Sequence, residues 1–443
     1  MDSQLFENIF SFSFPATADG NSSTVYDSDH GDIRTAPVPG LPGHAYVRWG
    51  FNDQLPYTVT ELLQADEVTA QNKLFNVITC YGAGIRLEDP RGPGHPVPEA
   101  VSEWAWRQNL PAYWLEQATD MKHYYFSVSV LILSQDGRRV NRIVHKDACY
   151  CRLAPADEQG RIHHLYYANW RDRSPKPGTV ERIALLDLND PLGDLRQRMG
   201  LEPNRYGITR SAPVRDRKFA ILTRFPTPGC EYYPVPYYAA IFRGGSYDEK
   251  RLISTGKRAK LRNSSTVKYQ VEVEHDYWTR LCTERGLVDP QEMAAAIRSE
   301  KEKIRDFVGG IENSGKVWIT GYYVNPDGKE VRDIRITLIE GAKEGGDWAD
   351  DLQAAANTIC YGDNIHPNLV GATPGKSQMN NSGSDKRELY VMKQALEMPW
   401  HDLMLRPLET ALRFNGWRVR PVVPLVQLTT LDEHRDLKEV KPQ

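Results

Sequence analysis

The stretch that decides the fold is residues 347–417, which reads DWADDLQAAANTICYGDNIHPNLVGATPGKSQMNNSGSDKRELYVMKQALEMPWHDLMLRPLETALRFNGW. It predicts a short helix at 347–360, a turn-rich link at 361–371, a polar loop at 372–383 and a long amphipathic helix at about 385–414. The apolar residues of this last helix recur at steps of three and four: Leu389, Met392, Leu396, Trp400, Leu403, Met404, Leu408, Ala411 and Leu412.

The ends of the long helix carry recognisable signals. Ser384 can cap its first turn, Asp385 suits its dipole, and Asn415-Gly416 ends it. At about 1.5 Å per residue the helix reaches roughly 45 Å, and Pro399 and Pro407 predict a kink at one or both positions. The loop before it is rich in Gly, Ser and Asn and has no core of its own, so it is either functional or disordered.

Length and composition limit the class of protein. The 443 residues suffice for two or three core-bearing regions, and a formal net charge of −3 means that any contact with DNA must be local or loose. The six Cys are scattered without framework spacing, which predicts reduced thiols. There is no apolar run of about 18 residues and no signal-peptide pattern at the N-terminus. These features indicate a protein made and used in a cytoplasm.

Five motifs carry a resemblance to a known family. The order aromatic-Gly-Asp-x-Ile-x-Pro-x-Leu-x-Gly at 361–371, Ser-Gly-Ser-Asp at 382–385 and Phe-Asn-Gly-Trp at 414–417 resembles the portal proteins of tailed bacteriophages, most of all prophage portals of Bacteroidetes-type bacteria. Trp-Gly-x-Asn-Asp-x-x-Pro at 49–56 and Tyr-x-x-Pro-x-x-x-Ala at 233–240 resemble the entries to the portal wing and stem. The resemblance is strong over 347–417, moderate over 46–172 and topological elsewhere.

The resemblance implies an α+β portal fold with an α/β wing, two stem helices, a small clip, a long kinked tunnel helix and a minimal crown. The expected boundaries are an N-terminal arm at 1–45, the wing at 46–235, stem helix 1 at 236–263, the clip at 264–288, stem helix 2 at 289–310, a wing hairpin and short helix at 311–371, the tunnel loop at 372–384, the tunnel helix at 385–417 and a tail or minimal crown at 418–443.

Periodicity within the expected wing predicts helices first and strands afterwards. The helices are expected at 57–64, 68–81, 97–108 and 112–121. A compact antiparallel unit follows, with strands at 123–133, 140–144, 148–153 and 161–170, a loop-rich stretch at 171–213 and a strand at 218–224. Further on, 316–324 and 331–339 predict a hairpin around Asn-Pro-Asp-Gly.

In the portal family the tunnel loop and the helix start behind it face DNA. Here these positions are Lys376, Ser377, Gln378, Asn380, Asn381, Ser382, Lys386 and Arg387. A polar, weakly charged loop can press on DNA without binding it tightly enough to stall its movement.

The expected first stem helix carries a cluster of positive charge on Lys250, Arg251, Lys257, Arg258, Lys260 and Arg262. One interpretation is a solvated charged face. The other is a positive ring that lines a channel once copies of the helix surround it, where phosphate contacts carry no sequence information. In the expected clip, an alternating strand at 267–273 precedes His275, Asp276, Tyr277 and Trp278, and the family implies that this region docks the packaging motor and later the tail adaptor.

Two stretches resemble a metal site and a nucleotide-binding loop, but their spacing does not match either. His145, Cys149, Cys151, His163 and His164 cluster in sequence, but Cys-x-Cys and adjacent His are not favoured zinc spacings, so we expect no metal and leave the possibility open. Gly-Ala-Thr-Pro-Gly-Lys-Ser at 371–377 has one residue too few between its glycines for a phosphate-binding loop and follows no strand. No catalytic motif is found, and we expect no cofactor.

Together these observations predict a non-enzymatic portal protein of the virion, made in the host cytoplasm. Its implied partners are further copies in a ring of about twelve, duplex DNA, the large terminase subunit, capsid or scaffold protein and a head–tail adaptor, with no membrane. The alternatives are a head–tail adaptor, or an enzyme of unassigned type whose pocket uses the Trp- and Tyr-rich first half. Trp104, Trp106, Tyr113 and Trp114 are more typical of a core. The subunit number, tail type and host stay open, as do the tunnel states and the presence of a crown.

Overall fold

The computed structural model describes residues 34–50, 52–92, 94–171, 175–204, 206–243, 245–263, 269–309, 322–324, 330–338, 347–370 and 383–426. The chain divides into two compact units. The first consists of residues 1–247, 356–373 and 377–443, and the second of residues 248–355 and 374–376.

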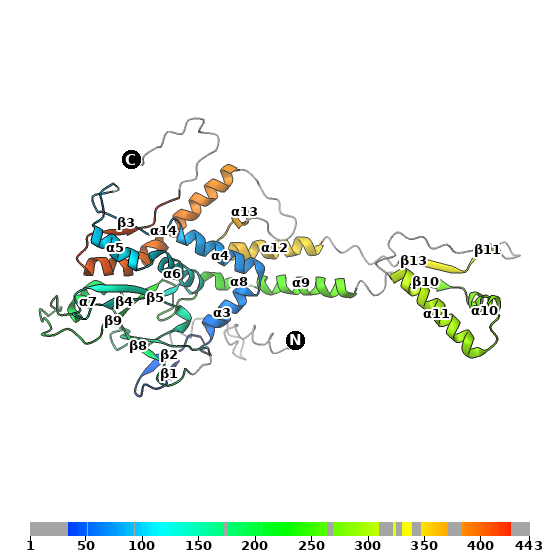
Figure 1. The fold of residues 1–443 in the computed structure, drawn as a ribbon, viewed down its shortest axis with the longest axis horizontal. Helices are drawn as coiled ribbons and strands as arrows, with labels where there is room; N and C mark the ends of the chain where they lie inside the picture. Colours follow the sequence, from blue (N-terminus) through cyan, green and yellow to red (C-terminus); the bar gives the residue numbers. More distant parts are fainter. Residues whose placement is uncertain are drawn as a thin grey trace. The chain divides into compact units, whose positions relative to one another are not determined.

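The first unit is built on a six-stranded sheet of order β5-β4-β9-β8-β7-β6 (Figure 1). Its strands are β4 Phe126–Leu133, β5 Val140–Lys146, β6 Cys151–Leu153, β7 His164–Tyr167, β8 Glu181–Leu185 and β9 Lys218–Arg224. Strand β4 is almost wholly buried, which explains its nearly continuous apolar sequence, FSVSVLIL. All neighbouring strands are antiparallel except β8 and β9, which are parallel.

The first unit also contains helices. They include α3 Leu55–Gln64, α4 Glu67–Tyr81, α5 Glu99–Arg107, α6 Leu110–Tyr124, α7 Pro191–Arg198, a short 3₁₀ turn at Tyr237–Ala239 and α8 Ala240–Arg243. Of these, α6 packs on strands β4 and β5. The Asp66 carboxylate accepts from the backbone N–H of Val68 and Thr69 and so caps α4. Two small antiparallel pairs complete the unit: β1 Thr35–Pro37 with β2 Ala45–Val47, and β3 Arg86–Glu88 with β14 Arg420–Val422.

The predicted long helix is confirmed as α14, Gly383–Phe414. It is continuous through Pro399 and Pro407, and its ribbon changes direction along its length in Figure 1. Ser384 lies inside the helix rather than before it, since the helix begins at Gly383. Its last turns place Leu408, Ala411 and Leu412 in the main core with residues of β4 and β9.

The second unit contains α9 Ser246–Asn263 from Asp248 onward, α10 His275–Glu284 and α11 Pro290–Gly309. Strand β10 Tyr269–Val273 pairs antiparallel with β13 Ile334–Leu338, and β11 Tyr322–Val324 pairs with β12 Glu330–Arg332. Arg285 joins the end of α10 to Glu300 of α11 at 2.9 Å. The predicted hairpin is thus confirmed in β11 and β12. The strand expected at 331–339 is divided at Asp333, and its second part pairs with β10.

Several predicted boundaries are wrong. Helix α6 continues to Tyr124, and the strand begins only at Phe126, because Tyr125 adopts a left-handed conformation (φ 56°) that ends the helix. The expected strand at 148–153 begins with a 3₁₀ turn, Ala148–Tyr150. The stretch at 171–213 contains β8, whose parallel pairing with β9 makes the sheet mixed rather than antiparallel. Among the four aromatic residues expected in the core, Trp106 is 83% exposed.

Candidate functional site

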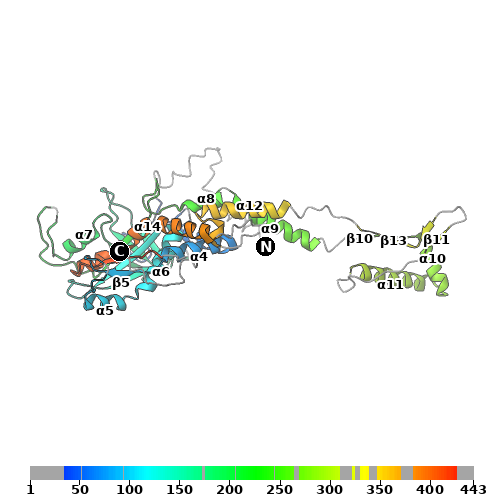
Figure 2. The ribbon, with the colours of Figure 1, turned by 90° about the horizontal axis from the view of Figure 1, so that it is seen from above.

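The candidate site is the region where the two segments that border residues 371–382 meet helices α4 and α6. Helices α4, α6 and α14 lie side by side in both views (Figure 1 and Figure 2). The carboxyl end of α12, Asp347–Gly362, and the short helix α13, Pro367–Val370, approach them before the chain reaches residue 371. The contacts of this region lie within the first unit.

The Gly-Asp-Asn-Ile-His-Pro motif forms the turn between α12 and α13. Gly362 has no room for a side chain, because a Cβ there would lie 2.5 Å from Ile241 Cγ1. Asn364 takes the left-handed conformation (φ 56°) that ends the helix, and the N–H of Ile365 donates to Cys360 O at 3.0 Å. Ile365 is buried, and Pro367 opens α13. The turn thereby aims Asp363 into the protein.

Asp363 is held by one face of α4. Its Oδ1 lies 2.5 Å from Lys73 Nζ, and its Oδ2 accepts from Asn72 Nδ2 at 3.3 Å. Its backbone carbonyl accepts from Asn76 Nδ2 at 3.1 Å. Lys73 Nζ also lies 3.2 Å from the centroid of the Tyr238 ring, a close cation–π contact. The turn is therefore fixed to α4 by charged and polar contacts, and the Tyr238 ring packs on the same lysine.

A second set of buried charges joins α14 to α6 and α4. Glu397 Oε2 lies 2.5 Å from Lys122 Nζ of α6, and Glu397 Oε1 lies 3.3 Å from Lys393 Nζ one turn earlier on α14. Lys393 Nζ donates to Asn76 Oδ1 at 2.7 Å and to Asn364 O at 3.3 Å. Lys393 therefore connects α14, α4 and the turn before α13. We call Lys73, Lys122, Asp363, Lys393 and Glu397 the buried ion cluster.

The electrostatics of the buried ion cluster are dominated by desolvation. All five residues are buried, with three potential cations against two carboxylates. Burial lowers the pKa of Lys73 to about 8, against the opposing attraction of Asp363. It also lowers the pKa of Lys393, and burial together with the nearby Lys73 lowers the pKa of His123 to about 4. Removing one partner of either short ion pair, Lys73–Asp363 or Lys122–Glu397, would therefore leave a buried charge without compensation.

The structure describes only part of the predicted DNA-facing set. Lys386 is exposed and Arg387 is partly exposed, both in the first turns of α14. Lys376, Ser377, Gln378, Asn380, Asn381 and Ser382 lie outside the described residues.

The predicted stem set is only partly on the surface. Lys257 and Arg258 are exposed and Arg251 is half-buried. Lys250 is 2% exposed and does not belong to an exposed positive face, because it lies one turn after the buried Tyr247 on the same side of α9. Lys260 and Arg262 lie on α9, but their side chains are outside the described part.

The predicted clip residues open helix α10. His275 is its first residue, and its side chain is outside the described part; Asp276 is exposed. Tyr277 and Trp278 are half-buried and meet edge to face, with ring centroids 5.2 Å apart. Lys301 Nζ of α11 lies 5.3 Å from the centroid of the Trp278 ring. The aromatic pair therefore contributes to the packing of α10 against α11.

The Cys and His cluster does not converge on a common point. His145 Nε2 lies 2.8 Å from Asp120 Oδ2, whereas His163 Nε2 lies 2.6 Å from Asp157 Oδ2 on the surface. Cys149 Sγ lies 3.0 Å from the Tyr124 hydroxyl, and burial raises the pKa of Cys149 to about 12. Among the residues that the structure describes, no group of three His, Cys, Asp or Glu is placed to hold a metal ion.

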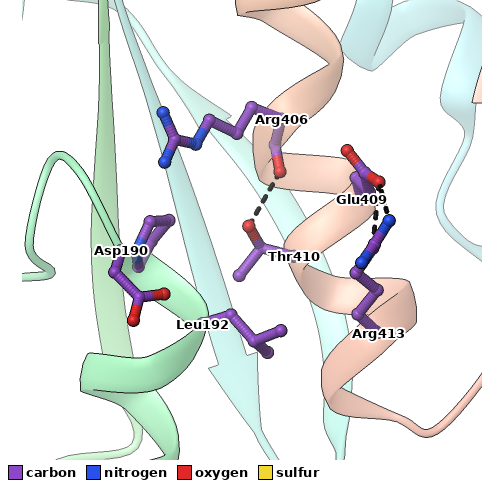
Figure 3. Close-up of a pocket in the computed structure, with 7 residues that line it drawn as sticks. Asp190, Leu192, Arg406, Glu409, Thr410 and Arg413 are labelled. Carbon is purple, nitrogen blue, oxygen red and sulfur yellow. Dashed lines mark hydrogen bonds and ion pairs between the residues drawn. The ribbon is translucent and has the colours of Figure 1, made fainter.

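A hollow of about 300 Å³ lies between α7 and the end of α14 (Figure 3). Its charged groups are already engaged, since Arg413 pairs with Glu409 at 2.6 Å and the Asp190 carboxylate caps α7. The Thr410 hydroxyl donates to Arg406 O at 2.8 Å. These residues form no nucleophile and base pair, so the hollow does not support the enzyme alternative.

Comparisons with known proteins identify the fold. No protein-family model and no curated protein matches the chain. Its structure is similar to a chain in the virion of a native gene transfer agent (GTA) particle, with a TM-score of 0.53 and 10% identity over 88% of this chain and 86% of that chain. A chain in the neck of the native GTA particle with C12 symmetry matches at a TM-score of 0.53 and 12% identity, over 89% and 88% of the two chains.

An HK97-family phage portal protein from Corynebacterium diphtheriae is also matched, at 11% identity over 80% of this chain and 89% of that chain, with a TM-score of 0.32. At such identities the GTA comparison shows the fold alone. It confirms the predicted α+β fold, which this chain shares with a chain of the GTA virion and neck. The assignment to Bacteroidetes-type prophages stays a prediction. None of the described helices has the length and hydropathy needed to span a membrane.

The buried ion cluster was missed in the sequence. Lys393 and Glu397 are four residues apart on α14, a spacing that predicts an ion pair within the helix. Their partners on α4, α6 and the turn are remote in the sequence and could not be predicted. The signal that could have found them is that Val391–Pro399 contains only three polar residues, Lys393, Gln394 and Glu397, all on one side of the helix.

Proposed function

We propose that this chain is the portal protein of a phage or prophage, a ring-shaped channel for double-stranded DNA at one capsid vertex. The fold is that of portal proteins, and the neck structure with a matching chain has C12 symmetry. In this role the chain is a structural component and not an enzyme. It acts in the virion after synthesis in the host cytoplasm, needs no cofactor, and the energy for DNA movement comes from a terminase ATPase in trans.

The observation that carries the proposal is that the first half of α14 buries charged side chains and exposes apolar ones. The charged Lys393 and Glu397 are buried, while Val391, Met392, Leu396 and Met398 are 57%, 62%, 52% and 52% exposed. An apolar helix face of this kind, backed by a polar interior, is typical of a surface that another protein covers. We assign that cover to a neighbouring copy, because a head-to-tail contact between unlike surfaces generates closed rings.

The unit offers a second apolar surface for such a contact. Leu74 and Ile78 on α4 are 54% and 53% exposed, and Leu115 on the adjacent α6 is 39% exposed. A cyclic assembly needs two different complementary surfaces on every copy. The outer face of α14 and this α4–α6 surface satisfy that requirement.

DNA contact is proposed for the loop at 372–384 together with Lys386 and Arg387, as in the portal family. The exposed Lys257 and Arg258 of α9 are proposed to face the channel, with Lys260 and Arg262 continuing the row. Such contacts to phosphates are independent of DNA sequence and weaken with added salt. The region around α10, with Asp276, Tyr277 and Trp278, is proposed to dock the large terminase subunit and later the head–tail adaptor, while capsid or scaffold protein surrounds the ring.

Deleting residues 375–383 tests this proposal within a packaging reaction. The expected result is that the shortened chain still assembles and that DNA packaging is lost. Normal packaging by the deleted chain would contradict the assignment of this loop to the channel.

A further inference from the structure

The buried ion cluster holds one more ammonium group than carboxylates. Lys73 forms an ion pair with Asp363 at 2.5 Å, and Lys122 forms one with Glu397 at 2.5 Å. Both carboxylates are thereby matched, each to one ammonium group. Lys393 is the third cation, and its ion pair with Glu397 is longer, at 3.3 Å.

The contacts of Lys393 are mainly to neutral acceptors. Its shortest bond, 2.7 Å, goes to the Asn76 side chain on α4, and another goes to the backbone carbonyl of Asn364 in the turn before α13. Because a buried ammonium group is costly to desolvate, a lysine placed here without its own carboxylate is a poor source of stability. What it does provide is a three-way connection between α14, α4 and the turn.

The other charged and titratable groups around this lysine are fixed by separate contacts. On α14, His401 Nε2 lies 2.7 Å from Cys80 O of α4. On α6, Lys122 Nζ lies 3.8 Å from the centroid of the Trp400 ring as well as next to Glu397. None of these three contacts involves Lys393, so we expect them to persist when Lys393 is replaced.

We propose that Lys393 is a positioning residue that holds α14 to the turn at 363–366, while the two short ion pairs supply the stability of the same region. The turn that it contacts leads into α13, and α13 and the start of α14 are the segments that border residues 371–382. The consequence for a DNA channel rests on the proposed function. The positioning role itself does not, because it concerns only contacts within one copy.

The substitution Lys393→Met separates the two roles. It removes one cation and leaves both short ion pairs, so two ammonium groups face two carboxylates. A methionine also retains the length and apolar stem of lysine. The measurement is hydrogen exchange of the full-length chain, followed by mass spectrometry, together with the thermal unfolding midpoint.

The expected result has two parts. The unfolding midpoint stays at or above the wild-type value, and amide exchange in 364–370 and 383–392 becomes about tenfold faster, as expected for the loss of a hydrogen bond from a charged donor. Exchange in β4, which lies in the sheet core, stays unchanged. Lys386→Met, at an exposed position of the same helix, is the matched control and should alter neither segment.

Three outcomes would overturn the proposal. Exchange in both segments could stay at the wild-type rate, which would mean that Lys393 positions nothing. Protection could fall equally in β4, or the variant could fail to fold, and either would make Lys393 a general stability residue. Lys122→Met, which breaks a short ion pair, gives the reference behaviour for such a general loss. None of these readings depends on ring formation or DNA, so the proposed function can fail independently.

Discussion

The side chain of Asn415 pairs with both backbone groups of Val140. Its Oδ1 accepts from Val140 N at 2.7 Å, and its Nδ2 donates to Val140 O at 3.0 Å. The residue that ends α14 thus takes the place of a neighbouring strand at the start of β5. This contact fixes the carboxyl end of the long helix to the edge of the central sheet and explains why an Asn stands in the Phe-Asn-Gly-Trp motif.

Replacing Asn415 by alanine should lower the free energy of unfolding by about 1–3 kcal/mol, because Val140 N–H loses its acceptor and Val140 O keeps only the Trp104 indole as donor. Chemical denaturation of the full-length chain measures this change. Arg418→Ala, at an exposed position just beyond the helix, is the control and should shift the midpoint little. Equal midpoints for Asn415→Ala and wild type would show that the paired hydrogen bonds are not part of the native contact.

Gly362 supports a second stability prediction. A Cβ at this position would lie 2.5 Å from Ile241 Cγ1, so Gly362→Ala should destabilise the chain by about 1–3 kcal/mol through overpacking. The double variant Gly362→Ala/Ile241→Ala should lose less stability than the sum of the two single variants, since Ile241→Ala removes the clashing atoms. Denaturation of both variants and of Ile241→Ala completes the cycle. Strict additivity of the two single changes would rule out the close approach.

The exposed apolar face of α14 yields a prediction on assembly. Met392→Glu with Leu396→Glu places two charges where we expect a neighbouring copy to pack, so assembly should be lost while the single chain stays folded. Light scattering after size exclusion, combined with circular dichroism, tests both parts. Lys386→Glu, a charge change nearby on the same helix, should leave assembly intact. Normal assembly of the double variant would place the subunit contact elsewhere.

The lowered pKa of Lys73 makes stability depend on pH. Burial brings its pKa from an ordinary 10.5 to about 8, so between these values the unfolded chain binds a proton that the folded chain releases. The contribution of Lys73 to the free energy of unfolding should therefore rise with pH between about 8 and 10.5. Urea denaturation at several pH values in this window, compared with Lys73→Met, isolates the contribution. A slope that is the same in both proteins would show that Lys73 does not titrate there.

Much of the fold was predictable because local signals agree with it. Apolar residues at steps of three and four predicted α14, and the alternating residues on either side of Pro-Asp-Gly predicted the pairing of β11 with β12. The parallel pairing of β8 with β9 was not predictable, since it joins strands separated by α7 and a long connection. The end of α6 was missed because Tyr124 and Tyr125 are common in strands as well as helices.

The candidate site was harder, for a physical reason visible on α14. Periodicity grouped Met392 and Leu396 with Met404 and Leu408 as one apolar face, yet the first pair is exposed and the second pair is buried. A sequence pattern indicates that a helix face is apolar, but it does not indicate whether that face is buried in the core or exposed on the single chain. Lys393 and Glu397 face inward because they contact Asn76, Asn364 and Lys122. These partners are far away in the sequence, so periodicity could not reveal them.

The central claim is that many copies of this chain close into a ring around a channel. The most direct measurement is the mass and shape of the purified full-length protein, from light scattering and electron-microscope images taken down the particle axis. We predict closed rings with an open centre and a mass near twelve times 50.4 kDa. A folded monomer at micromolar concentration, or an assembly without a central opening, would contradict the account.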